Sequence, residues 1–111
     1  MPGDQQNPPG VADLDPFIHT PARLRILALL SPARWVTFAY LRESIGTSDS
    51  ALSKQISALE RAGYLEIRKD RSGSSRTRVN LTDNGREAFG SYLQTLEQIV
   101  AQARSDPDTA R

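Results

Sequence analysis

Apolar residues recur every three or four positions along three short segments in the first half of the chain. The segments cover residues 21–30, 38–45 and 49–62, and this period predicts a helix in each of them. In the first segment the apolar stripe consists of Leu24, Leu27, Ala28 and Leu30. A short extended piece at residues 35–36 lies between the first two segments.

The residues that flank these segments are typical of helix ends. Thr20, Thr37 and Ser48 each precede a segment, where a side-chain oxygen can accept a hydrogen bond from a free backbone N–H. Gly46 and Gly63 follow the second and third segments, where glycine readily takes the left-handed conformation that ends a helix. We therefore expect three capped helices with a tight turn between the second and the third.

After Gly63 the period of the apolar residues changes from about three and a half to two. Residues 64–70 and 76–81 alternate apolar and polar side chains, and a Ser- and Gly-rich turn joins them, so the sequence predicts a β-hairpin. Thr82 then precedes a long helical pattern over residues 83–104. The predicted fold is mainly α with a small β-hairpin (α+β), in the order helix, strand, helix, helix, strand, wing, strand, long helix.

The second and third helices and the turn between them have the form of a helix-turn-helix, whose second helix enters the DNA major groove. Leu52, Ile56 and Leu59 predict the buried face of that second helix. The polar face left for base edges and phosphates consists of Ser50, Ser53, Lys54, Gln55 and Ser57. On an isolated helix, such a face would indicate only exposure to solvent.

The hairpin that follows is strongly basic, and this changes the interpretation of the polar helix face. Residues 48–82 carry seven Lys and Arg against four Asp and Glu, whereas residues 83–111 carry three against five. Another explanation is that charged residues on edge strands simply deter aggregation. That role predicts charges of mixed sign, or Lys, whereas residues 68–78 contain four Arg. We therefore expect double-stranded DNA as the partner, bound through a wing of Arg68, Lys69, Arg71, Arg76 and Arg78.

The stretch from Gly46 to Gly85 resembles the winged-helix core of the multiple-antibiotic-resistance (MarR) family of transcriptional regulators. The resemblance rests on five motifs: Ser53-Lys54, Leu59-Glu60, Ala62-Gly63-Tyr64-Leu65, Arg76, and Leu81-Thr82 with Gly85. It implies a dimeric regulator that binds a pseudo-palindromic operator and usually represses, with Ser50, Ser53, Lys54 and Ser57 facing the groove. Two features depart from the family pattern: Ser74 stands where an Asp usually precedes the wing arginine, and a single helix follows the hairpin.

The last helix carries an apolar stripe longer than a small winged-helix core needs to cover. One interpretation is that the stripe packs wholly on its own domain. We favour a two-fold dimer, because a single helix-turn-helix contacts too few base pairs to be selective. Phe17 and Ile18 are expected to add to the interface, whose main residues are Phe89, Tyr92, Leu93, Leu96, Ile99, Val100 and Ala103.

These assignments divide the chain into four parts. Residues 1–15 and 105–111 are polar and rich in Pro, Gly or Asp, so we expect disordered tails. Residues 16–82 form the predicted winged helix-turn-helix DNA-binding domain, and residues 83–104 form the C-terminal dimerisation helix.

The pattern of polar residues does not indicate a catalytic site or a metal site. The chain has no Cys, and its one histidine, His19, lies beside no carboxylate cluster, so a capping or surface role is expected for it. Trp35 is expected to anchor the core under the short strand; the other interpretation is that it walls a ligand pocket. We expect no enzyme activity, no cofactor and no metal.

The sequence therefore predicts a sequence-specific DNA-binding transcriptional regulator, a homodimeric repressor that a small-molecule effector would control if one exists. The alternative is a winged-helix module for protein–protein interaction, whose Arg residues contact acidic protein surfaces. The Arg density of the hairpin favours DNA. The chain has no run of roughly 18 apolar residues and no basic-then-apolar start, so we expect a cytoplasmic protein without membrane contact.

Overall fold

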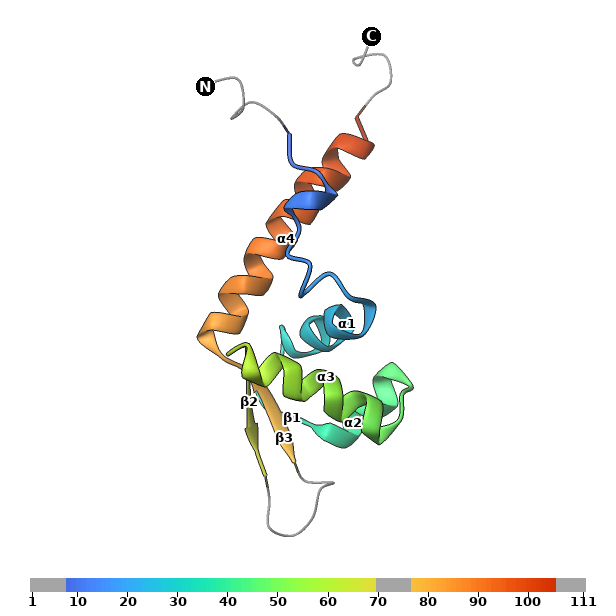
Figure 1. Cartoon of the computed structure of the whole chain (residues 1–111), viewed down its shortest axis with the longest axis vertical. Helices are drawn as coiled ribbons and strands as arrows, with labels where there is room; N and C mark the ends of the chain where they lie inside the picture. The colour runs from blue at the N-terminus through green and yellow to red at the C-terminus, as the bar shows by residue number, and fades with distance from the viewer. Residues whose placement is uncertain (1–7, 70–76, 106–111) are drawn as a thin grey trace.

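The computed structural model describes residues 8–69 and 77–105 and shows a winged-helix domain from which one long helix rises (Figure 1). The predicted α+β fold and the predicted order of elements are confirmed. In chain order the elements are the 3-10 helix η2 (Val11–Asp13), α1 (Pro21–Leu30), β1 (Val36–Thr37), α2 (Phe38–Ile45), α3 (Asp49–Arg61), β2 (Leu65–Arg68), β3 (Arg78–Leu81) and α4 (Asp83–Ala103).

Side chains cap three of the four α-helices. The hydroxyl oxygens of Thr37, Ser48 and Thr82 accept hydrogen bonds from the backbone N–H three residues further on, at 3.1, 3.2 and 2.9 Å. Thr20 precedes α1 as predicted, but its side chain makes no cap hydrogen bond. Its hydroxyl donates instead to the backbone carbonyl of Phe17, at 3.3 Å. Pro21 at the first helical position has no N–H, so one fewer backbone donor is left unpaired at this helix end.

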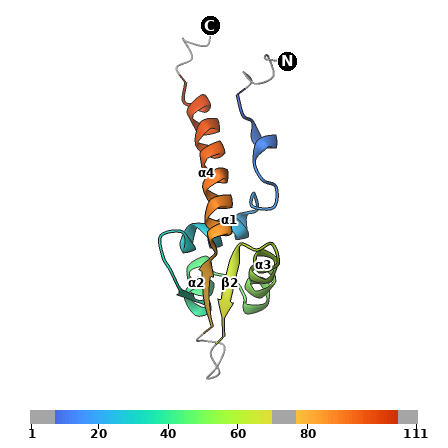
Figure 2. The same ribbon diagram turned by 90° about the vertical axis from the view of Figure 1, so that its left-hand side faces the viewer.

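The three strands form one antiparallel sheet in the order β1-β3-β2, and Figure 2 shows its strand β2 below α4. Val79 of β3 pairs with Val36 of β1 and with Ile67 of β2, and Leu65 pairs with Leu81. Because side chains alternate across a strand, these residues share the face that packs on the helices. On the opposite face, Glu66, Arg68 and Arg78 are exposed, whereas Asn80 is half-buried.

A single apolar core lies between the sheet and α1, α2 and α3. Ile26, Leu27 and Leu30 of α1 are completely buried in it. Ala28 was expected on this buried stripe, but it is exposed, because the face of α1 that meets the other helices is the one that carries Ile26. The expectation that Trp35 anchors the core is also wrong. The neighbouring Val36 takes the inward position of β1, and Trp35 is only half-buried.

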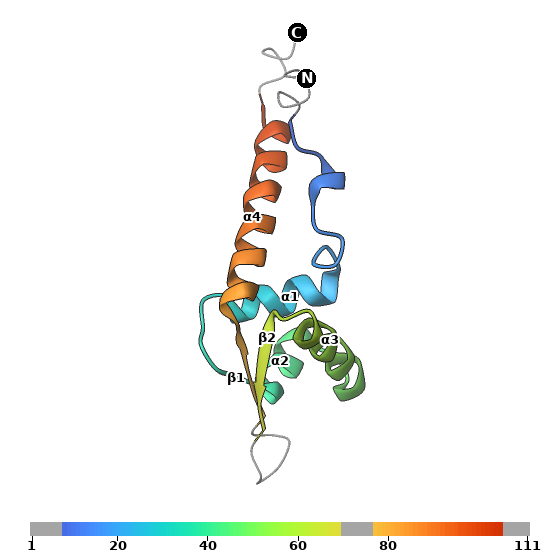
Figure 3. The same cartoon turned by 60° about the vertical axis from the view of Figure 1, so that its left-hand side comes forward.

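The N-terminal segment of residues 8–20, here called the strap, lies along α4 and crosses to the start of α1 (Figure 3). The expected disorder of residues 1–15 is therefore wrong for residues 8–15, and residues 1–7 lie outside the described part. The Asp13 carboxylate accepts the Gly10 N–H at 2.8 Å. Leu14 and Ile18 are 4% and 0% exposed. Ile18 was expected at a dimer interface, but it belongs to the core of its own chain.

The lower half of α4 packs on its own domain and the upper half extends beyond it (Figure 1). Phe89 and Tyr92 are 4% and 3% exposed within this single chain, so the expectation that they face a second copy is wrong. The other predicted interface residues follow them along the helix. Leu93, Leu96 and Ile99 are half-buried, whereas Val100 and Ala103 are exposed.

Backbone and side-chain hydrogen bonds fix the base of α4. The Thr82 N–H donates to the Tyr64 carbonyl at 3.0 Å, and the Thr82 hydroxyl donates to the Gly63 carbonyl at 2.7 Å while it caps Gly85. Gly63 has φ of 86°, a left-handed conformation that glycine adopts without strain. A Cβ on Gly85 would clash with the Tyr64 carbonyl oxygen, since the two atoms would lie closer than the sum of their van der Waals radii. Only glycine allows this close approach between α4 and the turn before β2.

We predict that Gly85→Ala destabilises the protein by about 1–3 kcal/mol, because the new methyl group must displace backbone and not a flexible side chain. Urea unfolding followed by circular dichroism measures the change. Gly90→Ala is the matched control on the same helix, since a Cβ at Gly90 meets no atom within 4 Å. That variant should be more stable than the wild type by about 0.5–1 kcal/mol, owing to the higher helix propensity of Ala. Equal effects of the two substitutions would contradict the close approach at Gly85.

Candidate nucleic-acid interface

The turn between α2 and α3 fixes the direction in which α3 leaves the core. Gly46 ends α2 in the left-handed conformation, with φ of 74°. A guanidinium nitrogen of Arg42 on α2 donates to the Asp49 carboxylate in the first turn of α3, at 2.8 Å. This hydrogen bond and the charge of Asp49 raise the pKa of Arg42 above its ordinary value, and Glu43 adds to the effect. The carboxylate also lies at the positive end of the α3 dipole, which favours it there.

Helix α3 divides into a buried face and an exposed polar face, as predicted. Leu52, Ile56 and Leu59 are buried against the core. Of the five predicted groove residues, three are exposed and lie away from the core: Ser50, Ser53 and Lys54. Ser57 is half-buried, at the side of the helix that faces the sheet.

Gln55 does not lie with the other predicted groove residues. Its side-chain oxygen accepts a hydrogen bond from Nε of Arg23 on α1, at 2.8 Å. On a helix with about 100° per residue, Gln55 therefore projects from the flank that faces α1, whereas Ser53 and Ser57 project from the flank that faces the sheet. The structure contradicts the expectation that Gln55 points into the DNA groove alongside Lys54.

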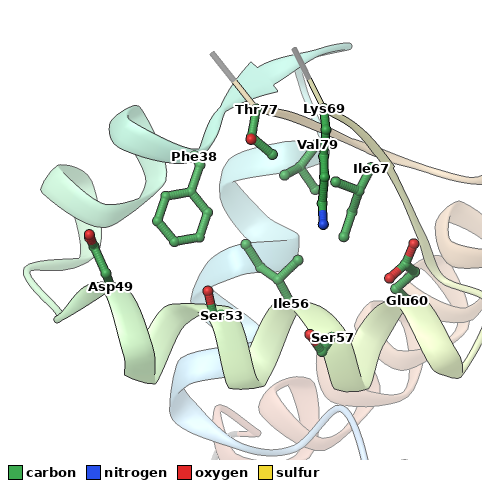
Figure 4. Close-up of a pocket in the computed structure, with 10 residues that line it drawn as sticks. All are labelled: Phe38, Asp49, Ser53, Ile56, Ser57, Glu60, Ile67, Lys69, Thr77 and Val79. Carbon is green, nitrogen blue, oxygen red and sulfur yellow. The ribbon is translucent and has the colours of Figure 1, made fainter. Parts of the chain in front are cut away.

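A groove of about 630 Å³ separates α3 from the sheet (Figure 4). Its floor is apolar, with Phe38, Ile56, Ile67 and Val79, and Ser53 and Ser57 line its α3 side. Figure 4 shows the amine of Lys69 above this floor, pointing from the sheet toward α3. Lys69 was predicted as a wing residue, and the structure places its charge between the sheet and α3.

The other described wing cations lie on the exposed face of the sheet. Arg68 and Arg78 are partners across β2 and β3, and both are exposed. The Arg68 guanidinium carbon lies 4.3 Å from the centre of the Trp35 ring, which is a cation–π stack. Arg71 and Arg76 lie outside the described residues. The basic ribbon therefore presents charge on two sides, with Lys69 toward α3 and the Arg pair away from it.

Sequence reasoning missed two interactions that shape this surface. Trp35 stacks with Arg68, although the two residues are far apart in sequence, and Arg23 holds Gln55 from a different helix. In the sequence, Trp35 and Arg23 are each a single residue among mixed apolar and polar neighbours, and nothing near them indicates the partner. Within residues 8–69 and 77–105, no cluster of metal-ligating side chains occurs, and no helix has the length and apolar content needed to cross a membrane.

Comparisons with known proteins agree with this geometry. The family of winged helix DNA-binding domains matches residues 22–100, which is most of the chain. A protein of Methanocaldococcus jannaschii described as uncharacterised is 33% identical over 78 residues, covering 69% of this chain and 85% of that protein.

Solved structures show the same fold. A transcriptional regulator homologue from Pyrococcus horikoshii OT3 has a TM-score of 0.74 at 27% identity, covering 80% of this chain and 89% of that one. A MarR-family transcriptional regulator from Silicibacter pomeroyi has a TM-score of 0.63 at 21% identity, with 83% of this chain and 63% of that one covered. The resemblance to MarR-type winged-helix regulators is thereby confirmed at the level of the fold.

We predict that Arg68→Ala shifts the fluorescence emission of Trp35 to longer wavelength, because removing the guanidinium exposes the ring to water. Trp35 is the only tryptophan of the chain, so its emission reports on this stack alone. The substitution should also cost about 0.5–1 kcal/mol of stability, as expected for an exposed cation–π pair. Arg78→Ala removes the neighbouring cation and serves as the control, with an unchanged emission maximum. An unshifted spectrum in Arg68→Ala would mean that the stack does not form in solution.

Proposed function

This chain belongs to the family of winged helix DNA-binding domains, and we propose that it is a homodimeric, sequence-specific transcriptional regulator that represses at a pseudo-palindromic operator. One observation carries the proposal. The exposed polar face of α3, with Ser50, Ser53 and Lys54, lies beside a sheet that presents Lys69 toward α3 and carries Arg68 and Arg78 on its other face.

The arrangement suits a duplex in which α3 occupies the major groove. The buried face of α3 holds the helix by its apolar side, so Lys54 and the Ser hydroxyls are left to contact base edges. Lys69, which directly follows β2, and Arg78 on β3 suit the phosphates that flank the groove. Because phosphates are the same at every sequence, the strands supply affinity and α3 supplies selectivity.

A second copy is expected to pack on the upper half of α4. Val100 is 38% exposed although it is apolar, and Ile99 beside it is only half-buried. Pairing of two such helices about a two-fold axis would bury these side chains and place two α3 helices on one duplex. Repression follows from the resemblance to MarR-type regulators, whose members usually exclude transcription from an occupied operator.

Response to a small molecule is part of the proposal because of the groove between α3 and the sheet. A ligand there would contact the apolar floor around Ile56 and lie beside Ser53, on the side from which DNA approaches. Its binding would therefore compete with DNA.

We predict that two substitutions have different effects on DNA binding, measured with an operator selected from random-sequence duplexes. Lys54→Ala should weaken operator binding by about 1–3 kcal/mol and spare random DNA, because the variant can no longer bond to a base edge. Arg78→Glu should weaken both, and the log–log salt dependence should flatten by about 0.9 for each phosphate that the variant no longer neutralises.

Arg104→Glu is the control for Arg78→Glu, because it makes the same change of charge at the far end of α4. If both reversals weakened DNA binding equally, net charge alone would explain the result and the ribbon would not bind the duplex. If the wild type bound neither the operator nor random duplex at low salt but did bind an acidic protein, the result would favour the protein-interaction module.

We predict that Val100→Asp shifts the protein from dimer to monomer at micromolar concentration. The charge would be buried without a partner in the dimer but remains solvated in the monomer, since Val100 is exposed there. Sedimentation velocity measures the change, and circular dichroism should show an unchanged helical content. Gln98→Asp places the same charge on an exposed position of α4 and should remain a dimer. A monomeric wild type would refute the dimer.

A further inference from the structure

Arg23 on α1 joins α3 to the strap with one guanidinium group. Its Nε donates to the Gln55 side chain on α3 at 2.8 Å, and one terminal nitrogen donates to the Phe17 carbonyl of the strap at 3.0 Å. The guanidinium carbon also lies 4.3 Å from the centre of the Phe17 ring. The side chain is half-buried, so these interactions are partly shielded from water.

The planar geometry of the guanidinium makes these interactions mutually dependent. Its N–H groups lie in the plane of the guanidinium and point outward in fixed directions, while the flat face can stack on an aromatic ring. The stack on Phe17 and the bond to the Phe17 carbonyl set the orientation of the plane. The remaining Nε–H direction then determines where the Gln55 oxygen lies. Gln55 is thereby held on the α1 flank of α3.

The strap that orients Arg23 is itself fixed to α4. Ile18 is completely buried next to Phe17, and Phe17 packs edge-on against Tyr64 with ring centres 6.0 Å apart. The residue after Ile18, His19, shares a hydrogen bond of 2.8 Å between its Nδ1 and the Tyr92 hydroxyl. The Tyr92 side chain is buried in α4, and this burial raises the pKa of its hydroxyl. The interactions therefore run without a break from α4 through the strap to α3.

We propose that Arg23 is a positioning residue for sequence recognition: burial of the apolar face determines which side of α3 is exposed, and Arg23, by holding Gln55 on the α1 flank, fixes the remaining rotation of α3 about its own axis in the DNA groove. The inference rests on the proposed DNA-binding function. Arg23 itself contacts no base. It acts through α3, so that the exposed face with Ser50 and Lys54 meets the base edges in one orientation.

A rotation of α3 matters more for bases than for phosphates. Base-edge hydrogen bonds need donor and acceptor aligned within a narrow range of angle, and they weaken steeply when misaligned. A phosphate interaction with Lys or Arg tolerates displacement, because its strength depends mainly on the distance between charges. Loss of the Arg23 bond should therefore reduce the ratio of operator affinity to random-DNA affinity.

The test is Arg23→Lys, which keeps the charge but removes the planar fork of donors. Arg25→Lys is the matched control, since Arg25 is on the same helix and its hydrogen bond, of 3.3 Å, goes to the Ser44 carbonyl and not to α3. We expect Arg23→Lys to bind the selected operator about tenfold more weakly, which corresponds to roughly one hydrogen bond with a charged partner. Binding to random duplex and its salt dependence should stay at the wild-type values, and Arg25→Lys should match the wild type in both.

Gln55→Met removes the same hydrogen bond by changing its acceptor and leaves Arg23 in place. A loss that both variants share is therefore due to the bond and not to a folding defect of one variant. It should reproduce the selective loss, and the double variant with Arg23→Lys should lose no more than either single variant. Losses that add would mean that Gln55 touches DNA independently, and the proposal would fall. It would also fall if Arg23→Lys lost operator and random binding in equal proportion, or neither. A wild type with no operator preference would overturn the proposed function itself, which the variants are not needed to show.

Discussion

The burial of one face of α3 determines most of the surface around it. Leu52, Ile56 and Leu59 are buried in the core that α1 shares with the sheet, because burial of apolar surface is the main source of stability in a domain of this size. Once those three side chains are inward, the helical period places Ser50 and Lys54 outward. The exposed polar face of α3 is therefore a geometric consequence of its apolar positions.

The position of the basic strands follows from the same core. Val79 lies at the centre of the sheet and pairs with both neighbouring strands, and its burial turns the flanking Arg78 to the opposite face. There it lies across from Arg68, and two like charges directly opposite each other are unfavourable in isolation. The Trp35 ring draws the Arg68 guanidinium to one side. The two guanidinium groups give this ribbon a local positive potential, which suits a polyanionic partner.

Close packing joins the winged-helix domain to α4 and makes them one body. Gly85 allows the first turn of α4 to touch the Tyr64 carbonyl, and the strap covers the middle of α4 with Leu14 and Ile18. Because α4 is fixed in direction, a second copy bound to its upper half would hold two α3 helices at a set spacing. The strap also connects through Phe17 and Arg23 to Gln55, so the support of α4 and that of α3 share one segment.

The order of the elements, the caps at Thr37, Ser48 and Thr82, and the buried face of α3 could all be predicted from the sequence. These features depend on residues within one or two turns of each other, and their spacing is visible in the chain. The folded structure was needed to show that Gln55 bonds to Arg23, that Trp35 stacks on Arg68 instead of filling the core, and that residues 8–15 pack on α4. Each of these interactions joins residues far apart in sequence, and it forms because the packing of the helices and the sheet brings their side chains together. A local sequence pattern does not show which distant residues will come into contact.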